Sequence, residues 1–133
     1  MKIELLAPPY SGHLHPLLAI ARQLQAQHQI TVLSTPGAQA AITASGLHGD
    51  VLLSAAHEAA LWQIANPGVA VKANPLRMHA QLRQALQLMA QMRHALQQRW
   101  AEQWPDLVIV DFTLPPAGLL AAELGIRWWT SLP

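Results

Sequence analysis

The chain has 133 residues, of which 52% are hydrophobic and only 11% are charged. This composition excludes a disordered chain and supplies enough apolar residues for the core of one domain. The formal net charge is +1 and the eight Lys and Arg residues are scattered, which argues against a nucleic-acid partner. Because the chain has no cysteine, disulfide bonds, thiolate metal sites and cysteine nucleophiles are excluded.

The first half of the chain alternates between strand and helix patterns. Pro16 is typical of a first helical position, and apolar residues at helical spacing follow it as far as Leu24. A second, alanine-rich helix is expected from Pro36 to about Gly46. The strands expected in this half are Ile3 to Ala7, Ile30 to Leu33 and, more weakly, Val51 to Leu53.

The second half begins with the longest regular pattern, after a stretch between Leu53 and Asn74 to which we assign no element. Asn74 is a favourable N-cap and Pro75 a favourable first residue for a helix that runs to about Trp104, with a break expected near its start. An apolar stripe recurs along this helix, made of Met78, Leu82, Leu86, Met89, Met92, Leu96 and Trp100. We expect the stripe to pack against a sheet, because a coiled coil would need more flanking charge.

The remaining residues predict a strand, a helix and a final strand. These are Leu107 to Val110, Pro115 to Leu124 ending at Gly125, and Arg127 to Ser131, in which one of the two tryptophans should enter the core. Such alternation predicts an α/β fold with a Rossmann-like, doubly wound parallel sheet of about five strands. The strand order expected is 3-2-1-4-5.

This strand order brings two chemically useful side chains together. His13 follows the first strand and Asp111 ends the fourth, so both lie at the carboxyl edge of the sheet, where such folds bind ligands. An unperturbed histidine has a pKa of about 6.5 and can accept a proton near neutral pH. A carboxylate on its other ring nitrogen would fix its tautomer. The alternative interpretations are a structural loop histidine and a helix-capping aspartate.

His15 lies two residues from His13, but two histidines without a third ligand do not predict a metal site. Residues 3–7 are too few for the apolar core of a secretory signal, and no run approaches the roughly 20 apolar residues of a membrane span. We therefore expect a cytoplasmic protein. The low charge leaves a peripheral membrane contact open.

Two blocks of the sequence carry a resemblance to a known family. The first is Gly12-His13-x-x-Pro16, followed by Leu18-Ala19-x-Ala21-Arg22-x-Leu24 and His28-x-Ile30-Thr31-Val32. The second is Pro105 to Phe112, followed by Ala121 to Ile126. Together they resemble the amino-terminal, acceptor-binding domain of two-lobed (GT-B) glycosyltransferases, which glycosylate hydroxylated small molecules such as carotenoids, macrolides and plant phenolics. Residues 50–104 match this pattern poorly.

The resemblance implies a chemistry for the pair. His13 would be the general base and Asp111 its orienting partner, in an inverting sugar transfer that needs neither metal nor cofactor. The partners implied are a nucleotide-sugar donor and an apolar small-molecule acceptor. Gly12 would lie near the donor phosphates. The residues implied to contact the acceptor are Tyr10, Ser11, Phe112 and Thr113.

The resemblance also implies that residues 1–133 are a partial amino-terminal acceptor-binding domain, and that the carboxy-terminal nucleotide-sugar-binding lobe is absent. We then expect the chain alone to be inactive, and its last strand to pair with another copy in a homo-oligomer. One alternative is a non-catalytic lobe or scaffold subunit of a split or truncated glycosyltransferase. Another, an unrelated Rossmann-like oxidoreductase, is disfavoured because no G-x-G-x-x-G motif follows the first strand.

Overall fold

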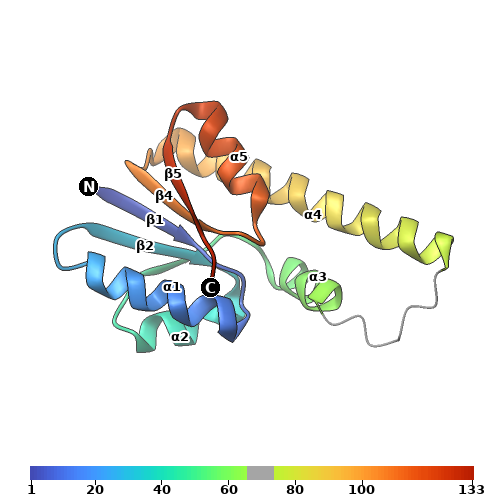
Figure 1. The fold of residues 1–133 in the computed structure, drawn as a ribbon, viewed down its shortest axis with the longest axis horizontal. Coiled ribbons are helices and arrows are strands. Elements are labelled where there is room, and N and C mark those ends of the chain that lie inside the picture. The colour runs from blue at the N-terminus through green and yellow to red at the C-terminus, as the bar shows by residue number, and fades with distance from the viewer. Residues whose placement is uncertain (66–73) are drawn as a thin grey trace.

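The computed structural model of the protein describes residues 1–65 and 74–133. Its centre is a five-stranded, wholly parallel sheet in the order β3-β2-β1-β4-β5, with helices on both faces (Figure 1). The strands are β1 (Lys2–Leu6), β2 (Gln29–Ser34), β3 (Gly49–Val51), β4 (Leu107–Asp111) and β5 (Arg127–Ser131). The fold class and the strand order predicted from the sequence are both confirmed.

The core consists of two clusters, one on each face of the sheet. The helices are α1 (Ser11–Leu24), η1 (Pro36–Ala38), α2 (Gln39–Ala44), α3 (Ala55–Ala65), α4 (Pro75–Glu102) and α5 (Pro115–Leu124). Ile3 and Leu5 of β1 pack with α1 and α2, whereas Leu6 packs in the cluster that contains α4 and α5 residues. This division follows from the alternation of side chains along a strand.

The site-bearing strand β1 is paired on both sides. Ile3 lies opposite Ile30 of β2, and Leu6 lies opposite Val110 of β4. The carboxyl ends of β1 and β4 are therefore neighbours, so the loops that follow these two strands meet at one edge of the sheet.

Helix α1 begins at Ser11, so the predicted start at Pro16 is wrong. Proline inside a helix removes the hydrogen bond to the carbonyl four residues earlier, which here belongs to Gly12. Gly12 and Pro16 are both exposed, so water can solvate that carbonyl, and the helix tolerates the proline. His13 is consequently on the first turn of a helix rather than in a loop.

The third strand is also displaced from its predicted position. It spans Gly49–Val51, where it pairs with Val32 to Ser34 of β2, instead of Val51 to Leu53. Leu53 is buried after the strand has ended, so the apolar run marks a core contact rather than the paired backbone.

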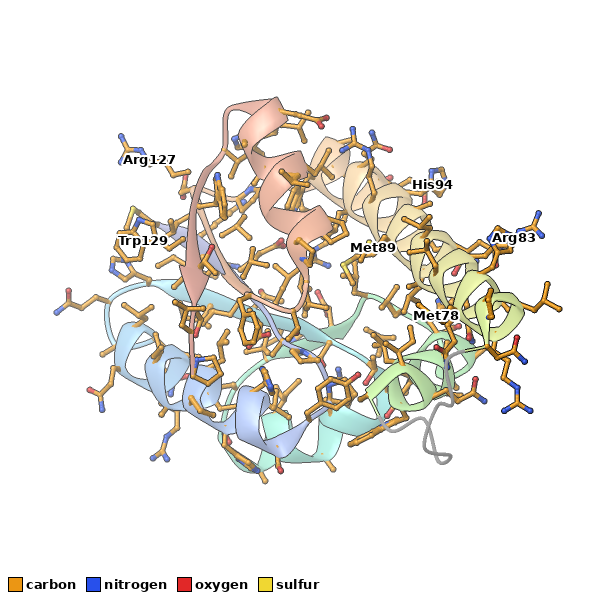
Figure 2. All side chains as sticks on the ribbon, turned by 45° about the vertical axis from the view of Figure 1, so that its right-hand side comes forward. Met78, Arg83, Met89, His94, Arg127 and Trp129 are labelled. Atoms are coloured by element: carbon orange, nitrogen blue, oxygen red, sulfur yellow. The ribbon has the colours of Figure 1, made fainter. Side chains whose placement is uncertain are left out.

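Helix α4 is continuous from Pro75 to Glu102, so the predicted break near its start is wrong. The Asn74 side chain caps it by accepting a hydrogen bond of 3.0 Å from the amide of Leu76. Its second half packs in the core through Leu88, Met92, Leu96 and Trp100. The first half of the helix extends beyond the sheet (Figures 1 and 2). The rest of the predicted stripe is therefore exposed, namely Met78, Leu82, Leu86 and Met89.

The last helix and strand form the other end of the sheet. Gly125, with φ of 75°, ends α5 in the left-handed conformation that glycine adopts without strain. Trp128 packs on Gly118 of α5, where an added Cβ would lie 2.6 Å from the indole ring. Trp128 and Trp129 stay 38% and 65% exposed, so the prediction that one of them enters the core is wrong. Because β5 is an edge strand, α5 covers only part of it, and Trp129 points outward (Figure 2).

Helix α3 fills most of the stretch to which the sequence assigned no element, and residues 66–73 of that stretch lie outside the described residues. It packs on the core through Leu61, and Glu58 accepts a hydrogen bond of 2.8 Å from the amide of Gly37. Among the described helices, none combines the length and the apolar composition that crossing a membrane requires.

Candidate functional site

The candidate site lies where the loops after β1 and β4 meet. The first turn of α1 begins there, with the amides of His13 and Leu14 donating to the carbonyl of Tyr10 at 3.0 and 2.8 Å. The Ser34 hydroxyl at the end of β2 donates to the carbonyl of Ala7 at 2.6 Å and ties the β1–α1 loop to the sheet. These contacts fix the position of the His13 side chain at the carboxyl edge.

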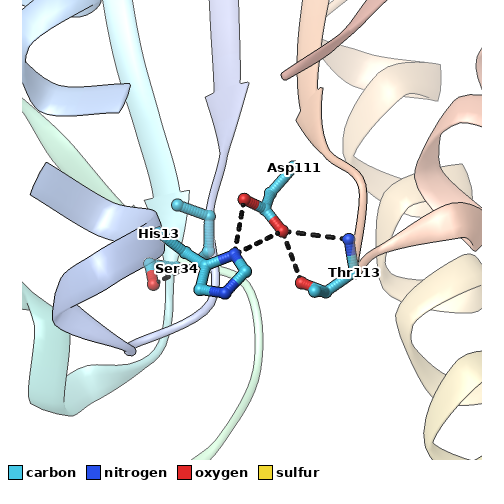
Figure 3. A network of polar contacts seen from close by, with 5 residues as sticks. His13, Ser34, Asp111 and Thr113 are labelled. Atoms are coloured by element: carbon cyan, nitrogen blue, oxygen red, sulfur yellow. Dashed lines mark hydrogen bonds and ion pairs between the residues drawn. The ribbon is translucent and has the colours of Figure 1, made fainter. Parts of the chain in front are cut away.

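His13 and Asp111 are in direct contact across this edge (Figure 3). The imidazole Nδ1 lies 3.0 Å from Oδ2 and 3.2 Å from Oδ1 of the carboxylate. The Asp111 side chain is fully buried, whereas that of His13 is 25% exposed. Because a carboxylate only accepts hydrogen bonds, Nδ1 is the donor, and in the neutral imidazole the lone pair is then on Nε2. Within the described part of the chain, Nε2 has no hydrogen-bond partner.

The buried carboxylate of Asp111 is also held from its own side of the site. The amide of Thr113 donates to Oδ1 at 2.9 Å and the hydroxyl of the same residue donates to it at 2.5 Å. The amide of Leu114 donates to the Asp111 carbonyl at 2.9 Å, which closes a tight turn before α5. A buried charge is costly unless it is hydrogen-bonded, and these donors meet that requirement.

Aromatic rings border His13. The ring centroid of Phe112 lies 5.5 Å from that of His13, and the Tyr10 ring lies 5.9 Å away, edge-on. The Tyr10 hydroxyl donates to the carbonyl of Leu61 at 2.8 Å, and burial raises the pKa of Tyr10. Trp62 of α3 packs edge-on against Tyr10 with a centroid distance of 4.8 Å. Phe112 and Trp62 are 48% and 41% exposed, so the rim of the site presents an apolar, aromatic surface.

The residues predicted from the sequence divide into those joined to the pair and those that stand apart. Tyr10 and Phe112 flank His13, and Thr113 contacts Asp111. Ser11 and Gly12 are exposed on the first turn of α1, and no atom lies within 4 Å of a Cβ built on Gly12. Trp62 was missed, because α3 has apolar residues on all sides and no helical periodicity that would have revealed it. Across residues 1–65 and 74–133, no three His, Asp or Glu side chains are grouped to hold a metal ion.

No family model matches the chain, and no curated protein matches it. Solved structures do match. The glycosyltransferase of kitacinnamycin superposes with a TM-score of 0.71 at 27% identity, over 96% of this chain and 29% of that one. SsfS6, a glycosyltransferase of Streptomyces sp. SF2575 complexed with thymidine diphosphate, gives 0.73 at 22% identity, over 98% and 38%. The calicheamicin glycosyltransferase CalG4 gives 0.72 at 23% identity, over 98% and 32%.

The fold is that of part of a GT-B glycosyltransferase lobe. The chain spans about a third of the length of the glycosyltransferases that it matches. The resemblance noted in the two sequence blocks is thus confirmed at the level of the fold, because almost the whole chain is covered. The middle of the chain is included in this match although its sequence resembled the family poorly.

Proposed function

We propose that an enzyme containing this chain transfers a sugar from a nucleotide-sugar donor to a hydroxyl group of an apolar small molecule. The observation that carries the proposal is the His13–Asp111 pair at the carboxyl edge, with Nδ1 bound to a buried carboxylate and Nε2 without a hydrogen-bond partner among the described residues. The GT-B fold supports it, as do neighbours solved with thymidine diphosphate, which are SsfS6, the spinosyn rhamnosyltransferase SpnG and VinC.

The geometry suits a single displacement. The acceptor hydroxyl gives its proton to Nε2 of His13 while its oxygen forms the new bond to the anomeric carbon. The bond from that carbon to the diphosphate breaks at the same time, so the configuration at the carbon inverts and a nucleoside diphosphate leaves. Asp111 stabilises the imidazolium that forms, because the two groups then carry opposite charges in contact. The step requires no metal, since the base is the imidazole.

The acceptor would lie against the aromatic rim. Phe112 and the Tyr10 ring offer apolar contact beside the His13 ring, and the exposed Ser11 residue offers a polar one. The Thr113 hydroxyl already donates to Asp111, which leaves its methyl group for acceptor contact. Gly12, on the first turn of α1, would approach the donor phosphates. We assign most of the donor site to chain outside residues 1–133, and therefore expect the chain alone to be inactive.

The test is His13→Ala in an active enzyme that contains this chain. Loss of the general base should lower the transfer rate by about 10²- to 10⁴-fold. His15→Ala is the matched control, because His15 is exposed on the same helix turn and makes no hydrogen bond within the described part of the chain. Near-normal turnover by a folded His13→Ala enzyme, with donor and acceptor saturating, would remove the base assignment.

We also infer that copies of the chain associate through strand β5. This strand pairs with β4 on one side, and its other edge has no strand beside it among the described residues. Unpaired strand edges readily pair with other chains.

A further inference from the structure

The role of Thr113 goes beyond acceptor contact. Its amide and its hydroxyl both donate to Oδ1 of Asp111, at 2.9 and 2.5 Å. His13 Nδ1 reaches the same carboxylate from the opposite side, nearer to Oδ2 than to Oδ1 (Figure 3). Oδ1 is therefore held by Thr113 as well as contacted by Nδ1, whereas Oδ2 is contacted by Nδ1 and not by Thr113.

We propose that Thr113 is the positioning residue of the His13–Asp111 pair. Its hydroxyl holds the carboxylate in the rotation that turns both oxygens toward Nδ1, with Oδ2 the nearer, and so keeps the proton on Nδ1 and, in the neutral imidazole, the lone pair on Nε2. The inference rests on the proposed function, since only a general base needs that tautomer. Thr113 acts through Asp111 and contacts no reacting atom in this role.

Two observations favour positioning over a purely structural role. Thr113 is exposed, so its side chain contributes little to the core, whereas the carboxylate that it binds is fully buried. Terminal carboxylate torsions are broad, so the buried group needs outside donors to select one orientation. The backbone amide of Thr113 supplies one donor, which the turn after β4 places. The side-chain hydroxyl of Thr113 supplies the second donor.

The experiment compares three variants of the 133-residue chain by ¹⁵N NMR of the His13 ring, which separates the two neutral tautomers. Thr113→Val removes the hydroxyl and keeps the shape, Thr113→Ser keeps the hydroxyl, and Thr130→Val makes the same atomic change in β5. Thr130 is the matched control because it is exposed and, within the described residues, its hydroxyl makes no hydrogen bond. Thr113→Ala replaces the Val variant if that protein fails to fold.

A hydrogen bond to a charged group changes an equilibrium about tenfold. We expect Thr113→Val to lower the ratio of the Nδ1–H to the Nε2–H tautomer by up to about that factor, while Thr113→Ser and Thr130→Val keep the unmodified ratio. An unchanged ratio in Thr113→Val would overturn the inference, even if its melting temperature falls, because a lower melting temperature alone indicates a structural role. An unchanged tautomer ratio would leave the assignment of His13 as the general base intact. That assignment is tested separately, because near-normal turnover by the His13→Ala enzyme would remove it whatever tautomer ratio is measured in the 133-residue chain.

Discussion

Glu4 is a charged side chain inside the molecule, in the middle of the central strand β1. It lies on β1 and is 5% exposed. Its carboxylate accepts from Nε of Arg99 at 2.6 Å and from the indole of Trp100 at 2.7 Å. Arg99 also reaches Asp50 of β3 at 2.9 Å. One carboxylate thus connects α4 to the centre of the sheet, and Arg99 extends the connection to its edge.

Replacing Glu4 by Ala should therefore destabilise the chain. The guanidinium and the indole would lose a buried partner, and removing one member of a buried ion pair costs about 3 kcal/mol. Glu102→Ala is the control, because Glu102 is exposed at the end of α4 and such changes stay within about 0.5 kcal/mol. Urea unfolding of both variants measures the difference, and equal midpoints would contradict the assigned role of Glu4.

The candidate pair was predictable because topology alone brings it together. The carboxyl ends of neighbouring parallel strands lie at the same edge, so knowing that β1 lies beside β4 is enough to expect His13, which follows β1, near Asp111, which ends β4. The anchoring by Thr113 was not predictable, since it depends on the turn between β4 and α5. Trp62 was not predictable either, because its position follows from the packing of α3.

Helix α4 has two halves with different environments. The half that ends at Glu102 lies in the core and is also joined to α5, where Arg93 donates to Glu123 at 3.1 Å and this hydrogen bond lowers the pKa of Glu123. The half that begins at Pro75 has exposed apolar side chains. The sequence could not distinguish the two halves, because apolar residues recur at the same helical spacing in both. Which of these side chains are buried depends on how far the sheet extends beneath the helix.

A matched pair of leucines tests this division. Leu96→Ala should lower the free energy of unfolding by about 2–5 kcal/mol, because Leu96 is fully buried and its removal leaves a cavity. Leu82→Ala should change it by no more than about 0.5 kcal/mol, because Leu82 is 59% exposed. Chemical denaturation decides the matter. A large loss from Leu82→Ala would mean that the first half of α4 is covered in solution.

At the scale of the elements, what the sequence predicted correctly has a local cause. Buried parallel strands are continuous apolar runs, and helix ends are marked by residues such as Asn74 and Gly125. The elements that the sequence predicted wrongly depend on exposure to solvent and on pairing with distant strands. Pro16 is tolerated inside α1 because Gly12, whose carbonyl loses its hydrogen bond, is exposed to water, and β3 is a strand because β2 pairs with it.

At the scale of the whole molecule, strand β5 has no strand on its outer side among residues 1–65 and 74–133. Trp129 is 65% exposed on this strand, and the chain carries few charges to discourage pairing. Among the described residues, the outer edge of β5 therefore combines backbone groups without a strand partner and an exposed apolar side chain. This combination promotes association between copies of the chain.

We expect the 133-residue chain to form dimers or larger species at micromolar concentration, and Trp129→Glu to shift them toward monomers. Light scattering measures both. Leu82→Glu places the same charge on the exposed half of α4 and should leave the association unchanged. Dissociation by Leu82→Glu alone would assign the interface to α4, and a monomeric unmodified chain would mean that the edge is protected.

The double pairing of β1 sets an order of events during synthesis. Its partner β2 is synthesised soon after it, at Gln29–Ser34, whereas its other partner β4 begins only at Leu107. At about 5–20 residues per second, a ribosome that has finished β2 needs on the order of 4–15 s to reach β4. Until then the second edge of β1 stays unpaired and His13 has no carboxylate beside it. In the nascent chain, incorrect strand pairing is therefore most expected at the unpaired edge of β1, the strand that later forms the centre of the sheet.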